Sequence, residues 1–150
     1  MRFHIAQLDT SDISPRGATR VEEELNALAE KFEAGGNVIV GEDFMPQQNS
    51  IRSLMVLKYE QGNPNHTRYS FQFFDSRNGY GVVDKLLNQR VLEIERDNKK
   101  VVRSLLVPMR NDAFTQILLA YVPTKKEVVA NAKIDRTTKS VEREVSTSGK

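Results

Sequence analysis

The chain has 150 residues, a net charge of +2 and no cysteine. This length suits one domain that buries about two-thirds of its unfolded surface, so its core needs no metal or disulfide cross-link. The lack of cysteine excludes disulfide bonds, iron–sulfur and zinc-thiolate sites and a cysteine nucleophile.

The sequence carries no recognisable targeting or membrane-spanning signal. Polar and apolar residues alternate in Arg2-Phe3-His4-Ile5, and we expect no signal peptide. Long uncharged stretches such as 113–124 are far shorter than the ~20 apolar residues that cross a bilayer. We therefore expect no membrane partner, and a location in the cytoplasm, or in a virion if the protein is viral.

The first predicted elements are a strand around Phe3 and Ile5 and a helix over 20–34. Thr19 and Glu22 have the spacing of a capping box, in which each side chain accepts from a backbone N–H of the first turn. One apolar stripe follows at spacings of four, three and four residues, and two glycines end the helix: Val21, Leu25, Leu28, Phe32, Gly35 and Gly36.

Most of the chain after this helix is predicted as strands, because branched and aromatic residues alternate with polar ones between turn-forming segments. The expected strands are 37–40, 51–59, 67–74, 90–95, 101–107 and 114–122. The last run is continuous in apolar residues and suits either helix or strand, with its branched and aromatic ends favouring strand. Residues 82–87 suit a short helical segment, and the polar residues 96–100 suit a hairpin tip.

These elements predict an α+β fold. We expect a mainly antiparallel sheet of about six strands, with the amphipathic helix 20–34 packed on one face. Residues 1–124 would form this single domain, and residues 125–150 would form an extended basic C-terminal arm.

The arm differs from the rest of the chain in composition and charge. It has no aromatic residue, Leu, Met or Pro, and its seven basic and four acidic residues give +3, against −1 for residues 1–124. Burial of its few apolar side chains does not offset the backbone entropy of roughly 1–2 kcal/mol that each fixed residue loses. We therefore expect that a neighbouring subunit or partner orders the arm. The predicted contact residues are Lys125, Lys126, Val128, Ala130, Ala132, Ile134, Arg136, Lys139 and Arg143.

Four of these arm residues alternate with other residues over seven positions, from Val128 to Ile134. Such a segment suits a strand that adds to the sheet edge of a partner. A solvated tail, and an edge strand on the chain's own sheet, are the alternatives.

The aromatic residues of the strand 67–74 have two interpretations. Tyr69, Phe71 and Phe73 share one side of this strand, and Arg68 lies on the other. In the first, bases stack on these rings and phosphates pair with nearby cations, so the strand is a single-stranded nucleic-acid site. Its binding residues would be Arg68, Tyr69, Phe71, Phe73, Lys99 and Lys100. The alternative is that these rings form the core against which the helix 20–34 packs.

Catalytic and metal-binding patterns are missing from the sequence. His4 and His66 lie far apart without zinc-ligand spacing, and Glu93 and Glu95, on an expected strand, lack the lysine of a nuclease motif. No serine nucleophile motif or phosphate-binding glycine loop occurs. We therefore expect no cofactor, no metal and no enzymatic activity.

The sequence thus favours a non-catalytic structural or assembly protein, a subunit of a homo-oligomer or larger particle in which the arm contacts a neighbouring subunit. A virus or phage virion component is one instance of this class. The alternative is a single-stranded nucleic-acid-binding protein that uses the aromatic strand and the basic tail. A protein that sequesters a small ligand between subunits is a third class.

Overall fold

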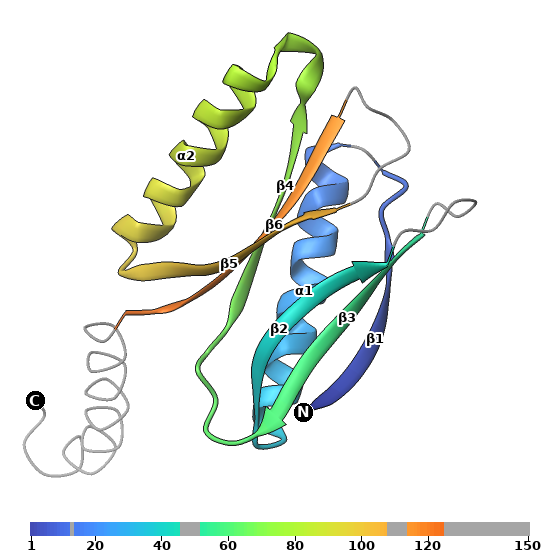
Figure 1. Cartoon of the computed structure of the whole chain (residues 1–150), viewed down its shortest axis with the longest axis vertical. Helices are drawn as coiled ribbons and strands as arrows, with labels where there is room; N and C mark the ends of the chain where they lie inside the picture. Colours follow the sequence, from blue (N-terminus) through green and yellow to red (C-terminus); the bar gives the residue numbers. More distant parts are fainter. Residues whose placement is uncertain (13, 46–51, 108–113, 125–150) are drawn as a thin grey trace, which may run out of the picture.

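The computed structural model describes residues 1–12, 14–45, 52–107 and 114–124, which form two three-stranded antiparallel sheets and two α-helices (Figure 1). Sheet A has the strand order β1-β3-β2 and sheet B the order β4-β6-β5. The strands are β1 (Arg2–Asp9), β2 (Asn37–Met45), β3 (Arg52–Gln61), β4 (Arg68–Asp75), β5 (Lys99–Val107) and β6 (Phe114–Pro123), and the helices are α1 (Pro15–Ala34) and α2 (Tyr80–Arg96).

The α+β class is confirmed, but the six strands form two sheets rather than one. The consecutive strands β3 and β4 are not paired, because β4 pairs with β6 in the second sheet. Pairing between strands distant in sequence depends on packing, which no local pattern specifies. The expected C-terminal arm, and with it the division at residue 124, lies outside the described residues.

Helix α1 begins five residues earlier than the sequence predicts. Its N-cap is Ser14, whose hydroxyl accepts a hydrogen bond from the Gly17 N–H at 3.2 Å, and Pro15 occupies the first turn. Proline suits this position because its fixed φ is helical and its missing N–H has no partner there. The predicted cap at Thr19 is therefore wrong, and its hydroxyl donates instead to the Pro15 carbonyl at 2.9 Å.

The main core lies between α1, one face of sheet A and one face of sheet B. The predicted apolar stripe of α1 does face this core, where Val21 and Leu25 are buried and Leu28 and Phe32 pack beside them. Both sheets supply the remaining buried residues: Ala6, Leu8, Ile39, Met55, Leu57, Tyr69, Phe71, Val107, Leu118 and Ala120. One core thus joins the two sheets.

Helix α2 packs on the other face of sheet B and forms a second, smaller core (Figure 1). Val83, Leu87, Val91 and Ile94 recur at spacings of four, four and three residues and face Ile117 and its neighbours. The short helix expected at 82–87 therefore extends to residue 96, and the strand expected at 90–95 is wrong.

The expected hairpin tip at 96–100 is wrong for the same reason. Its residues form the end of α2, a short turn at Asp97 and Asn98, and the start of β5. Within the described residues, neither helix combines the length and apolar composition needed to cross a membrane.

Candidate functional site

Sheet A has two apolar faces, and α1 covers only one of them. In an antiparallel pair, directly opposed residues point to the same face. Phe3 lies opposite Lys58 and Ile5 opposite Val56, whereas the buried Ala6 and Leu8 point to the other side. The side chains of Phe3 and Ile5 therefore point away from α1.

The face away from α1 carries an apolar patch built from all three strands of sheet A. Its members, which we call the outer patch, are Phe3, Ile5, Met45, Leu54 and Val56. Phe3, Ile5 and Met45 are 61%, 60% and 46% exposed, and Leu54 and Val56 in the central strand are half-buried. Contiguous apolar surface of this kind is typical of interaction sites.

An ion pair lies on the same face as the outer patch. Lys58 Nζ lies 2.6 Å from a carboxylate oxygen of Asp43, and register places both residues on this side of sheet A. The stem of Lys58 passes over Gly41, where its Cδ would come within 3.3 Å of an added Cβ. Lys58 lies opposite Phe3 and Asp43 lies opposite Val56, so this ion pair directly adjoins the outer patch.

The strand edges of the two sheets differ in how they are covered. The outer edge of β4 is capped by α1, where the Asn26 side chain accepts from the Tyr69 N–H at 2.7 Å and donates to the Tyr69 carbonyl at 3.1 Å. Glu22 accepts from the Phe71 N–H at 3.0 Å. Glu22 therefore binds a strand edge rather than capping its own helix.

Strand β1 is an edge strand of sheet A. In the part of the chain that the structure describes, β3 is the only strand that pairs with β1. Strands β2 and β5, one from each sheet, approach each other and are joined where Arg103 binds Glu42. An edge strand presents a row of N–H and C=O groups and is a template for pairing with another chain.

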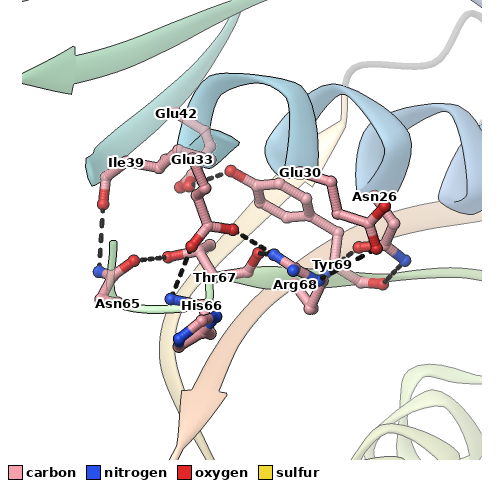
Figure 2. A network of polar contacts seen from close by, with 10 residues as sticks. All are labelled: Asn26, Glu30, Glu33, Ile39, Glu42, Asn65, His66, Thr67, Arg68 and Tyr69. Atoms are coloured by element: carbon pink, nitrogen blue, oxygen red, sulfur yellow. Dashed lines mark hydrogen bonds and ion pairs between the residues drawn. The ribbon is translucent and has the colours of Figure 1, made fainter. Parts of the chain in front are cut away.

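A buried polar cluster joins the two sheets near their shared core. Glu42 on β2 has a side chain only 3% exposed, and Arg103 on β5 donates to both of its carboxylate oxygens at 2.8 Å. The hydroxyl of Tyr69 on β4 donates to the same carboxylate at 2.7 Å, as Figure 2 shows. Both oxygens of Glu42 are therefore bonded, and the cluster acts as a clamp between β2, β4 and β5.

The surroundings of the clamp shift the pKa values of Tyr69 and Arg103. Burial, followed by the negative charge of Glu42 and the hydrogen bond to it, raises the pKa of Tyr69 far above its ordinary value. The hydrogen bond to Glu42 raises the pKa of Arg103. Both shifts hold these groups in the protonated forms that bind the carboxylate.

A pocket of about 220 Å³ opens beside the clamp. It is lined by Glu42 and Arg103 together with apolar residues and one serine: Ser104, Leu105, Leu118 and Ala120. The carboxylate and guanidinium groups at this pocket are already paired with each other.

A second polar cluster holds the loop before β4 (Figure 2). Glu33 on α1 is buried, forms an ion pair with Arg68 and accepts from the His66 N–H at 2.7 Å. The Thr67 hydroxyl donates to the Asn65 side chain at 2.6 Å. Arg68, expected to bind phosphates, is thus bound by a carboxylate of its own chain.

The structure places the aromatic strand in the core. Tyr69 and Phe71 are 1% and 3% exposed and pack with the apolar stripe of α1. Phe73 is half-buried and stacks on Phe114, with ring centroids 5.0 Å apart. The core interpretation is confirmed for Tyr69 and Phe71, whose rings have no surface on which a base could stack.

The remaining predicted residues lie in two places. Lys99 and Lys100 begin β5, with Lys99 Nζ 5.8 Å from the ring centroid of Tyr121. This end of sheet B also holds Arg68, which pairs in register with Tyr121. The predicted arm residues lie outside the described residues.

The histidines and acidic residues considered for metal binding are scattered. His4 packs its ring against Phe32 at 5.2 Å, and Glu93 and Glu95 lie on α2 rather than on a strand. Over the described ranges, no group of three or more His, Asp or Glu side chains is placed to hold a metal ion.

The outer patch and the clamp were not predicted from the sequence. A signal for the patch exists, because β1 has apolar residues at odd positions (Phe3, Ile5) and at even positions (Ala6, Leu8). Strands that are buried on both faces have apolar residues at odd and even positions alike. The pairing of Glu42 with Arg103, 61 residues apart, has no such signal.

Comparison of the chain with protein-family models, with curated proteins and with solved structures finds no match.

Proposed function

We propose that this protein is a non-catalytic assembly protein, a subunit of a homo-oligomer or of a larger particle. In this proposal the outer patch of sheet A is covered by a neighbouring copy, and the arm at 125–150 contacts a neighbour. The observation that carries the proposal is the exposure of Phe3 and Ile5, at 61% and 60%, beside the edge of β1.

The two faces of sheet A support this proposal. A sheet in a monomer commonly has one apolar and one polar face, whereas the central strand of sheet A has the continuous apolar run Leu54-Met55-Val56-Leu57. Met55 and Leu57 are buried against α1. The other two residues of this run lie in the outer patch, and a second copy would complete their burial.

The polar clusters also support a structural role. The carboxylate of Glu42, whose side chain is 3% exposed, is bound on both oxygens and links the sheets. Such internal pairing stabilises one arrangement of the two sheets, so a neighbouring copy meets a surface of fixed shape. A virion component is one instance of this proposal, with the cytoplasm or the virion as the location.

Substitution of the outer patch tests the proposal. Ile5→Lys places a charge at the centre of the proposed contact, and losing the burial of one large aliphatic side chain costs about 2 kcal/mol, or roughly 30-fold in association constant. We expect the mass measured by light scattering to fall towards that of one chain, with an unchanged circular dichroism spectrum.

Leu106→Lys is the matched control, because Leu106 is 69% exposed on β5 of sheet B, outside the outer patch. It makes the same chemical change on the other sheet, and we expect the mass of the assembly to stay unchanged. A loss of mass in Leu106→Lys but not in Ile5→Lys would assign the contact to another surface and refute this proposal.

A further inference from the structure

The edges of the two sheets suggest where the C-terminal arm binds. The outer edge of β4 is occupied by Asn26 and Glu22 of α1, and β2 approaches β5 where Glu42 binds Arg103. Within the described part of the chain, β1 pairs with β3, and the outer patch lies beside its other edge. A strand added along β1 would therefore lie next to the exposed side chains of Phe3 and Ile5.

We propose that the edge of β1 receives segment 128–134 of a second copy of this chain as an added strand. This inference rests on the proposed function and names the surface that the arm contacts. Main-chain hydrogen bonds would supply affinity, and alternate side chains would supply specificity, as in other cases of strand addition.

The chemistry of the segment fits this edge. Its seven residues match the eight residues of β1, and Val128, Ala130, Ala132 and Ile134 fall on one side of an extended chain. Placed beside Phe3 and Ile5, these side chains extend the outer patch by one strand. The intervening residues, Val129, Asn131 and Lys133, then point to the opposite face.

The course of the chain favours a second copy over the chain's own arm. Strand β6 ends near the turn between α2 and β5, where the Thr124 N–H donates to the Asn98 carbonyl at 2.9 Å. In Figure 1 this end of β6 and strand β1 lie on opposite sides of the molecule. Val128 follows Thr124 by four residues, so an extended chain spans only about 13 Å between them.

This connection has a consequence for the symmetry of the assembly. The arm of one copy would bind β1 of the next, so the contact joins two different surfaces. Head-to-tail contacts of this type close into rings or continue as filaments, and a reciprocal exchange between two copies gives a dimer.

Disulfide cross-linking tests the inference directly, because the natural chain contains no cysteine. We would mix a full-length Ile5→Cys variant with a full-length Ala132→Cys variant, oxidise the mixture and run a non-reducing gel. We expect a disulfide-linked dimer band at least ~10-fold stronger in the mixture than in controls or in either variant oxidised alone, since a disulfide forms only when the two Cβ atoms approach within about 3.5–4.5 Å.

Two controls separate strand addition from random collision. Leu106→Cys is as exposed as Ile5→Cys but lies on β5, and it should give only background product with Ala132→Cys. Asn131→Cys shifts the thiol to the other face of the added strand and should also lower the yield with Ile5→Cys. Equal yields from all pairs would overturn the inference.

Deletion of 125–150 distinguishes this inference from the proposed function. If the deletion lowers the mass of the assembly but Ile5→Cys and Ala132→Cys fail to cross-link, the arm binds elsewhere and the inference is wrong while the proposed function stands. If the intact chain already has the mass of a monomer, the proposed function fails, and the inference fails with it. A cross-link within one chain carrying both cysteines, without one between mixed chains, also overturns the inference.

Discussion

Removing Arg103 should destabilise the protein by leaving a buried carboxylate without its cation. In Arg103→Met the apolar stem is retained, but Glu42, at 3% side-chain exposure, keeps only the Tyr69 hydroxyl as a donor. Breaking a buried ion pair costs 3–5 kcal/mol, and the 30% exposure of the Arg103 side chain favours the lower limit, about 3 kcal/mol. For a chain of this size, that loss lowers Tm by roughly 6–12 °C.

The second half of this experiment is Glu42→Gln. In the natural chain this change weakens charge-assisted hydrogen bonds and should cost about 1–2 kcal/mol. In the Arg103→Met background it removes the unpaired charge instead, so the same change should increase stability. The free energy of unfolding, measured by urea denaturation of the four proteins, gives the coupling energy of the pair.

The effect of Glu42→Gln on the free energy of unfolding should therefore have opposite signs in the natural chain and in the Arg103→Met variant. We expect the double variant to lose about 2 kcal/mol, well below the sum of the two single losses. If the two losses add within about 0.5 kcal/mol, the carboxylate and the guanidinium are not coupled, and the clamp between the sheets is refuted.

Three further substitutions test other parts of the structure. The pKa of Tyr69 is raised in the folded protein, mainly by burial, so this tyrosine ionises first in the unfolded chain. The folding stability present below pH ~10 is therefore lost as the pH rises above ~10. Tyr69→Phe should reduce this dependence of the free energy of unfolding on pH, as measured by urea denaturation at several pH values. Tyr80→Phe, at a position 71% exposed, should retain it. Equal slopes against pH in the two variants would contradict the burial of Tyr69. Asn26→Leu leaves the Tyr69 N–H and C=O without partners, so we expect the free energy of unfolding to fall by about 2–3 kcal/mol. The Tyr69 amide hydrogen should also exchange faster. The control Glu24→Ala should change neither quantity measurably. Phe71→Ala should cost about 3–5 kcal/mol of folding stability, since the ring is 3% exposed; a stable variant that only alters nucleic-acid binding would assign the ring to the surface.

The sequence predicted those parts of the fold that depend on local periodicity. The stripe from Val21 to Phe32 identified α1 because four apolar residues at helical spacing require one buried face. The start of this helix was missed because Thr19 and Glu22 match a capping box, although Ser14 followed by Pro15 was the cap. Glu22 binds the edge of β4 instead, and no local signal reports that contact.

The second helix shows how window length affects such predictions. Over six residues, 90–95 fits a strand, because Leu92 and Ile94 are two positions apart. Over the whole of α2 the stripe from Val83 to Ile94 has helical spacing. The longer window was the informative one, because only it distinguishes a period of 3.6 from a period of 2.

The candidate site depends on long-range packing and was largely inaccessible to sequence analysis. The choice between core and binding surface for Tyr69 and Phe71 was decided by the position of α1 on that face. The exposure of Phe3 and Ile5 depends on which face of sheet A this helix covers, a choice set by tertiary structure. The arm residues remain a prediction from composition and alternation.

The most direct test of the account is the mass of the purified full-length chain in solution. Size-exclusion chromatography with light scattering and ultraviolet absorbance, at low and high salt, measures both mass and nucleic-acid content. We predict a salt-resistant species that contains several chains and only protein, and that Ile5→Lys reduces towards the mass of one chain. A single-chain mass for the natural protein, or a nucleic-acid-bearing species that high salt strips to single chains, would contradict the account.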